Sequence, residues 1–86
     1  MDIRIEPHTL ARAEERGASL AEIRDVIGTG NDEPAREGRL ARAKVFLFQG
    51  EWSGRFYPEK RIRVIYVLEG DTVATITVYV YYGKWD

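Results

Sequence analysis

Residues 61–82 read RIRVIYVLEGDTVATITVYVYY, two runs of mostly β-branched and aromatic residues that meet at Gly70-Asp71. Residues of these kinds favour β-strands, and a glycine-first pair suits a two-residue type II′ hairpin turn. We therefore predict one strand from Arg61 to Glu69 and another from Thr72 to Tyr82. This antiparallel hairpin forms the centre of the predicted sheet.

The two-residue turn fixes the register of these strands, and the register determines which side chains share a face. If Glu69 pairs with Thr72, small aliphatic side chains fall on one face, with Arg61 and Arg63 at its far end. We expect the helices to cover this aliphatic face, which comprises Val67, Ala74, Ile65, Ile76, Val78 and Val80. The opposite face, the Tyr/Thr face, collects Tyr66, Thr75, Thr77, Tyr79 and Tyr81 with Leu68, Val73, Val64 and Ile62. We interpret it either as a binding surface or as a half-exposed sheet or dimer interface.

The residues before the hairpin predict a short strand followed by two helices. Apolar and polar residues alternate from Asp2 to Glu6, which is typical of a strand. Pro7 favours the start of a helix, which we expect to end at Arg16 with Gly17 as a left-handed cap. The segment Ser19-Leu20-Ala21-Glu22 has the form of a capping box and predicts that a second helix begins there.

Between the helices and the hairpin, the sequence predicts a loop and one further strand. Residues 30–38 are polar and contain proline and glycine, so we expect a loop there, whereas residues 44–49 favour a strand. Glycine and proline in residues 50–60 indicate a turn or a long loop. The sequence of that segment is compatible with two connections between the strands, a hairpin and a crossover.

The length of the chain, 86 residues, allows one hydrophobic core and is too short for two. We therefore expect a single domain over residues 1–86. The predicted fold class is α+β, with an N-terminal short strand and two helices packed on one face of a curled antiparallel β-sheet of three to four strands.

The composition excludes several kinds of chemistry. The chain has no cysteine and one histidine, so it cannot build a typical zinc site, and it has no glycine motif for a nucleotide. We expect neither a metal nor a cofactor. The first residues, Met1 to Arg4, lack the apolar core of a signal peptide, so we expect none, and no apolar run is long enough to cross a bilayer as a helix. We therefore expect a cytoplasmic location and no membrane partner.

The net charge of −1 argues mildly against nucleic acid as a partner, because proteins that bind phosphates usually carry a positive excess. Two segments are nevertheless locally basic, one within residues 36–44 and the other within residues 55–63. They contain Arg36, Arg39, Arg42 and Lys44, and Arg55, Lys60, Arg61 and Arg63. Separated charges give a neutral protein a positive surface only if the fold brings such segments together, which the sequence leaves open.

A basic stripe on the first helix is the feature most suggestive of catalysis. His8, Arg12 and Arg16 are spaced four residues apart and therefore line up along one face of that helix. Histidine suits general acid or base catalysis, and arginines suit a phosphate or a developing negative charge. The alternative interpretation is a solvated helix face, with the arginines paired to Glu14 or Glu15 and His8 capping or packing.

Two parts of the chain resemble a small bacterial domain-of-unknown-function family. Residues 7–23, PHTLARAEERGASLAEI, are similar to the opening PHAxxRxxERGIxxEEI of that family. Residues 63–66, RVIY, and 76–79, ITVY, look like its RVVY and VTVY strands. This family is grouped with the RelE-like and BrnT-like toxin folds, in which two N-terminal helices cover one face of an antiparallel sheet and RNA is cut on the other.

The resemblance implies a toxin-type endoribonuclease that cleaves RNA without a metal, in a system where an antitoxin protein holds it neutral. The catalytic candidates are His8, Arg12, Arg63 and Tyr79. The candidates for RNA binding are Arg16, Arg61, Tyr66, Thr77 and Tyr81. The competing hypothesis is a non-catalytic module that binds a protein partner or a second copy of the chain. Whether the helix stripe reaches the Tyr/Thr face is left open.

Overall fold

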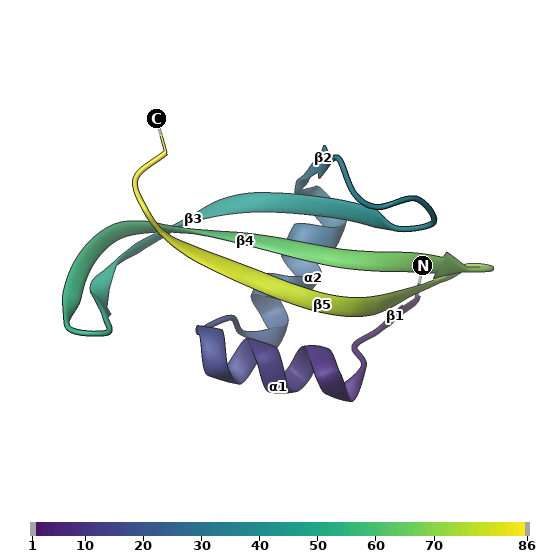
Figure 1. Cartoon of the computed structure of the whole chain (residues 1–86), viewed down its shortest axis with the longest axis horizontal. Helices are drawn as coiled ribbons and strands as arrows, with labels where there is room; N and C mark the ends of the chain where they lie inside the picture. The colour runs from purple at the N-terminus through teal and green to yellow at the C-terminus, as the bar shows by residue number, and fades with distance from the viewer. Residues whose placement is uncertain (1, 86) are drawn as a thin grey trace.

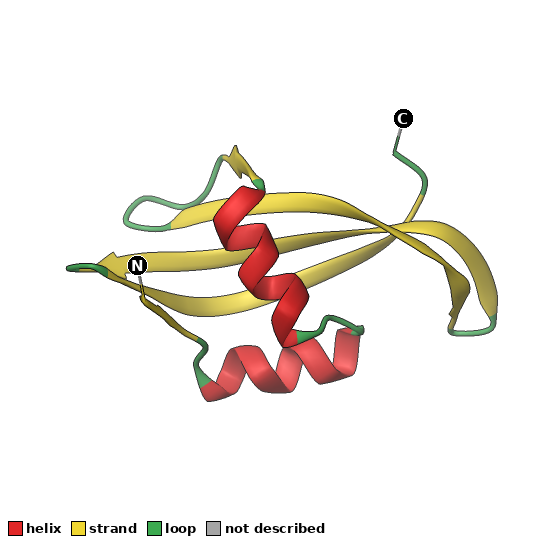
Figure 2. Ribbon diagram, turned by 180° about the vertical axis from the view of Figure 1, so that it is seen from behind, coloured by secondary structure: helices red, strands yellow, loops and turns green. Residues whose placement is uncertain are grey.

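The part of the chain that the structure describes, residues 2–85 of a computed structural model, folds into two helices and five strands (Figure 1). In chain order they are β1 (Asp2–Arg4), α1 (Pro7–Arg16), α2 (Leu20–Thr29), β2 (Asn31–Glu33), β3 (Leu40–Trp52), β4 (Arg55–Glu69) and β5 (Thr72–Gly83). The helix α2 crosses one face of the sheet, and α1 runs along the β5 edge and packs into the same core (Figure 2). The predicted α+β class is confirmed.

The strands form one sheet in the order β1-β5-β4-β3-β2. The pairs β2–β3, β3–β4 and β4–β5 are antiparallel, but β1 runs parallel to β5. The prediction of three to four antiparallel strands was therefore wrong in number and in direction. The sequence prediction missed β2 because its three residues, Asn31 to Glu33, are polar and lie inside a segment with loop composition.

The helix boundaries follow the local signals in the sequence. The helix α1 begins at Pro7, and Gly17 ends it with a φ of 87° while its N–H donates to the carbonyl of Ala13. The capping box is present, because the Glu22 N–H donates to Ser19 Oγ and the Ser19 N–H donates to Glu22 Oε1. Both predicted helix starts are confirmed.

Two tight turns connect the three long strands. Gly70 has a φ of 63° and Glu69 pairs with Thr72, as the sequence predicts. At the other end, Ser53 and Gly54 both have positive φ, as a type I′ turn requires. Residues 50–60 are therefore a hairpin arm and not a crossover.

Pro58 lies inside β4, although its residue type favoured a turn. Opposite it, the pairing of β3 is irregular between Leu47 and Gly50, and β5 ends its pairing with β4 at Glu59. Proline has no N–H to donate, so it is tolerated at such a bulge but not in a regular central strand. The long β3–β4 arm depends on this irregularity.

One extra residue in β5, Ile76, interrupts the alternation of its side chains. Tyr66 pairs with Thr75 and the next residue, Ile65, pairs with Thr77, so Ile76 has no partner in β4. Such a β-bulge exchanges the two faces for every residue beyond it.

The predicted assignment of faces was therefore wrong for β4 and for the first part of β5. Ile62, Val64, Tyr66 and Val73 belong to the core under the helices, together with Val78. The opposite face, which we call the open face, carries Arg61 paired with Tyr81, Arg63 paired with Tyr79, and Ile65 paired with Thr77. Thr75 is buried and accepts a hydrogen bond from the Glu6 N–H.

A buried lysine joins the two helices to the sheet. Lys60 is 7% exposed, and its Nζ donates to the Gly17 carbonyl at 2.7 Å and to Glu22 Oε1 at 3.0 Å. It thus neutralises the C-terminal end of α1 and the capping carboxylate of α2 at the same point. The core proper, with Ile23, Val26 and Ile62 fully buried, lies beside this contact.

The hairpin arm curls back toward the corner between the helices (Figure 1) and holds an aromatic cluster around Tyr82. The ring of Trp52 stacks on that of Tyr82 with centroids 4.8 Å apart, and Phe48 and Tyr57 contact the same ring. The Tyr82 hydroxyl donates to the Arg16 carbonyl at 2.7 Å. Burial, with a smaller effect of Glu22, raises the pKa of the Tyr82 phenol above its ordinary value of 10.0.

The variant Lys60→Met tests the junction between the helices. It keeps most of the side-chain volume but leaves the Gly17 carbonyl and the Glu22 carboxylate without their donor. We expect the free energy of unfolding in urea to fall by about 2–3 kcal/mol. Lys44→Met is the matched control, since Lys44 pairs with Asp25 at a more exposed site and should cost about 1 kcal/mol or less. Equal losses would contradict the assigned role of Lys60.

The variant Tyr82→Phe tests the buried hydroxyl through its pH dependence. The folded state favours the neutral phenol, so the contribution of this group is present below a pH of about 10 and is lost as the pH rises through the folded-state pKa. We expect wild type to be more stable than Tyr82→Phe by about 1 kcal/mol at neutral pH. The difference should shrink above pH 10; chemical unfolding at a series of pH values measures it, and a constant difference would contradict the assignment.

Candidate nucleic-acid interface

A groove of about 220 Å³ lies on the open face, on the side of the sheet away from the helices. Its floor comes from β4 and β5, and its rim comes from the loop between β2 and β3. The lining residues are Ala35, Arg36, Arg39, Arg63, Ile65, Thr77 and Tyr79.

The β2–β3 loop forms the rim because one hydrogen bond holds it against the sheet and a second closes its own turn. The Arg63 guanidinium donates to the Pro34 carbonyl at 2.7 Å, and the Arg39 N–H donates to the Arg36 carbonyl at 3.0 Å. Gly38, with a φ of 81°, allows the chain to turn between these points. The loop thereby places Arg36 and Arg39 over the sheet.

One carboxylate, that of Glu33, binds two of the arginines on this face. It accepts hydrogen bonds from Arg61 and Arg63, and all three side chains are 24% exposed. Within residues 2–85, neither Arg36 nor Arg39 forms an ion pair. The arginines at this face therefore outnumber the carboxylate that pairs with them.

A further arginine reaches the open face from α1. Figure 1 shows α1 alongside β5, and β1 covers only residues 72–74 of the outer edge of that strand. Arg16 crosses the uncovered part: it donates to the Val78 carbonyl at 2.7 Å, and its guanidinium lies 5.1 Å from the centre of the Tyr79 ring. The helix stripe and the open face thus meet at Arg16.

The other two members of the stripe do not share these contacts. His8 is exposed on the first turn of α1, and by the rise of the helix its backbone lies about 12 Å from that of Arg16. Arg12 pairs with Glu15 at 3.1 Å. The solvated-face interpretation is therefore confirmed for Arg12, and Arg16 departs from it.

The remaining predicted residues divide between the two faces. Arg61, Thr77 and Tyr81 lie on the open face with Arg63 and Tyr79. Tyr66 is 6% exposed and packs in the core on the helix side, so the thickness of the sheet separates it from them. The sequence interpretation overlooked Glu33, Arg36 and Arg39 as site residues; the basic segment was visible, but not the loop that folds it onto the sheet.

Residues 2–85 contain no group of three or more histidine, cysteine, aspartate or glutamate side chains that could hold a metal ion. Neither α1 nor α2 is long and apolar enough to span a membrane, and they are the helices of that same range.

No protein-family model, no curated protein and no solved structure matches the chain. The resemblance of its motifs to the RelE-like and BrnT-like toxin group stays a prediction from the sequence.

Proposed function

We propose that the open face binds RNA and that the chain is a metal-independent endoribonuclease of toxin type. The observation that supports this most is the groove where Arg36, Arg39 and Arg63 surround Thr77 and Tyr79. Arginine presents a planar set of N–H donors that matches a phosphate, and several arginines around one groove suit a phosphodiester.

Single-stranded RNA is the form of nucleic acid that this surface suits. Tyr79 and Tyr81 are 37% and 45% exposed on the open face, so their rings are accessible to unstacked bases. Arg16, stacked on Tyr79, adds a cation beside such a base. Arginines contact the phosphate backbone and tyrosines stack on any base, so such a face favours binding with weak sequence preference.

The proposed reaction is cleavage by the RNA's own 2′-hydroxyl. The 2′-oxygen attacks the adjacent phosphorus and gives its proton to water, while the bond from phosphorus to the 5′-oxygen breaks. Tyr79 protonates the departing 5′-oxygen, and Arg63 with Arg39 neutralises the negative charge that develops on the phosphate. The products are a 2′,3′-cyclic phosphate and a 5′-hydroxyl, and no metal takes part.

The RelE-like or BrnT-like architecture belongs to this proposal. In the toxins that the motifs resemble, two helices cover one face of the sheet and RNA is cut on the other. Here α2 crosses one face, with α1 along its β5 edge (Figure 2), and Arg61 and Arg63 lie on the opposite face. The proposed setting is the bacterial cytoplasm, with an antitoxin protein as the partner that keeps the chain inactive.

Cleavage of a single-stranded RNA oligonucleotide in the presence of a chelator tests the reaction. We expect Tyr79→Phe to slow cleavage by about 10²-fold and Arg63→Gln by about 10²–10³-fold. Arg24→Gln, on the exposed side of α2, and Tyr57→Phe, in the hairpin arm, are the matched controls. A 2′-deoxy nucleotide at the cut position should abolish the reaction.

Two results would contradict the assignment of Tyr79. One is cleavage of the 2′-deoxy substrate, and the other is full activity of Tyr79→Phe. If His8→Ala lost activity while Tyr79→Phe kept it, the predicted role of His8 would replace that of Tyr79.

Glu33 should limit the affinity for RNA, because its carboxylate occupies the donors of Arg61 and Arg63. We expect Glu33→Gln to tighten RNA binding by about five- to tenfold, since it removes one negative charge from the binding surface. Asp32→Asn, on the neighbouring residue that faces the helix side, is the control. Fluorescence anisotropy at fixed salt measures the affinity, and weaker binding by Glu33→Gln would argue against RNA on this face.

A second candidate function, a non-catalytic protein-binding or homodimerising module, is favoured by the outer edge of β3. The strand β2 covers only residues 41–43 of that edge, and Leu47 beyond it is 73% exposed. An uncovered strand edge with exposed apolar side chains invites pairing with another strand. A stable dimer with no cleavage of RNA would select this function over the first.

A further inference from the structure

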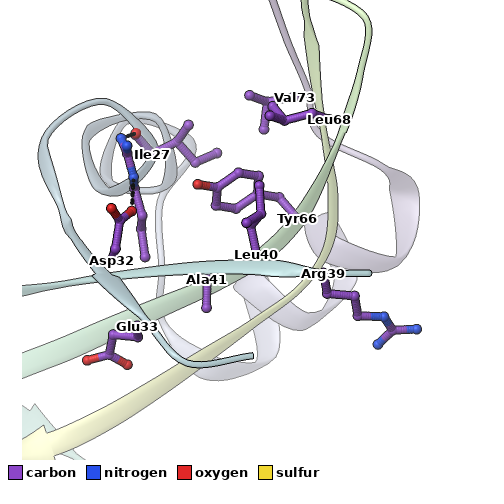
Figure 3. Close-up of a pocket in the computed structure, with 10 residues that line it drawn as sticks. Ile27, Asp32, Glu33, Arg39, Leu40, Ala41, Tyr66, Leu68 and Val73 are labelled. Atoms are coloured by element: carbon purple, nitrogen blue, oxygen red, sulfur yellow. Dashed lines mark hydrogen bonds and ion pairs between the residues drawn. The ribbon is translucent and has the colours of Figure 1, made fainter. Parts of the chain in front are cut away.

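A second and larger hollow, of about 420 Å³, lies at the other side of the sheet, where α2 ends and β3 begins (Figure 3). Its lining comprises Ile27, Asp32, Glu33, Arg39, Leu40, Ala41, Arg42, Tyr66, Leu68 and Val73. Ligand pockets of proteins usually range from about 300 to 1,000 Å³. The hollow is therefore large enough for a small molecule, and the proposed RNA chemistry does not use it.

Most of its wall is apolar. Ile27 and Val73 are buried at its base, whereas Leu40 and Leu68 at its mouth are 43% and 53% exposed. Two exposed leucines beside a hollow lose contact with water when an apolar group enters between them. That loss favours an occupant with a hydrocarbon body.

Two donor groups reach the apolar wall. The Tyr66 ring lies inside the hollow with its hydroxyl directed toward the Ile27 and Asp32 side (Figure 3), and within residues 2–85 that hydroxyl forms no hydrogen bond. Arg42 is fixed by Asp32 Oδ1 at 2.9 Å from its Nε and by the Ile27 carbonyl at 2.5 Å from its Nη1. A guanidinium has five N–H groups, so Arg42 keeps donors for an incoming acceptor.

The charges around the hollow favour an anion as that acceptor. Arg42 and Asp32 neutralise each other, and Glu33 is engaged by Arg61 and Arg63 on the open face. Arg39 borders the hollow, although its guanidinium points away from it in Figure 3, and it forms no ion pair within residues 2–85. Both carboxylates of the lining are therefore already paired, so an incoming anion meets no unpaired carboxylate in the hollow.

We propose that this hollow binds a small carboxylic acid with an apolar chain or ring. The hydrocarbon body lies among Ile27, Leu40, Leu68 and Val73, and the carboxylate accepts hydrogen bonds from Arg42 and the Tyr66 hydroxyl. Arg39 and Glu33 border both this hollow and the open face, but the groups that hold the acid, Arg42, Tyr66 and Leu68, do not line the open-face groove, so the proposed binding does not rest on the ribonuclease activity.

Titration of the full chain with octanoate, followed by amide chemical shifts in NMR, tests the proposal. We expect saturable shifts around Ile27, Leu40 and Val73. Acetate, which lacks the hydrocarbon body, and octan-1-ol, which lacks the carboxylate, should each bind at least about tenfold more weakly. Tyr66→Phe should weaken the binding of octanoate by about tenfold, which is the effect of losing one hydrogen bond to an ion.

The exposed leucines supply a matched pair of variants that leaves the core intact. Leu68→Asp places a negative charge at the mouth and should weaken octanoate binding more than tenfold, about the effect of one unfavourable charge contact in a partly shielded site. Leu47→Asp, at a still more exposed leucine of β3 outside the hollow, should leave binding unchanged. The shift pattern of each free variant reports whether it is folded.

Three outcomes would overturn the proposal. Octan-1-ol that binds as tightly as octanoate would remove the role of the carboxylate. Shifts confined to Arg63, Thr77 and Tyr79 would place the anion in the open-face groove instead. A dimer that Leu68→Asp dissociates would show that a second copy of the chain fills the hollow. Loss of RNA cleavage in Tyr79→Phe has no bearing on any of them, so the two proposals fail separately.

Discussion

The β-bulge at Ile76 is the constraint on which the two faces of this protein depend. Before the bulge, Val73 and Thr75 point toward the helices. After it, Val78 and Val80 point toward the helices, whereas Thr77 and Tyr79 point away from them. If Ile76 instead paired regularly with Ile65, the second half of β5 would present Thr77 and Tyr79 to the helix layer and its valines to solvent. A single unpaired residue therefore keeps the core apolar along the whole strand and directs the tyrosines of β5 to the open face.

The distribution of charge explains how a chain with a net charge of −1 presents a basic surface. Glu14, Glu15, Glu22 and Asp25 belong to the helices, and on the open face the carboxylate of Glu33 is outnumbered by the two arginines that it pairs with, Arg61 and Arg63. The strands and the β2–β3 loop place arginines on the open face, and Arg16 alone crosses from the helix layer to join them. Charges on opposite sides of the sheet interact weakly, because dissolved ions screen them over that distance. The local excess of positive charge therefore determines which ligand the open face attracts.

The sequence predicts those parts of the fold whose cause lies within a few residues. Pro7, Gly17 and the Ser19–Glu22 capping box set the helix ends, and Gly70 sets a turn, because each acts through its own backbone. Ile76 gives no such signal, since an isoleucine in a bulge looks like any strand residue. Pro58 was misread for a related reason: it is tolerated in β4 only because the partner strand is irregular there. The bulge at Ile76 decides which side chains of β4 and β5 share the site, and Arg36 and Arg39 join it because the loop around Gly38 folds over the sheet, a long-range arrangement with no local sequence signal.

The pairing of β1 with β5 joins residues 2–4 to residues 72–74, which lie far apart along the chain. Within this domain, β1 and α1 therefore complete their packing only after β5, which follows them in the chain, has formed. Contacts so distant along the chain form late and make folding slower than in a helical protein of this length. Since β5 carries Tyr79 and also pairs with β1, a nascent chain cannot assemble the open face before β5 has been synthesised.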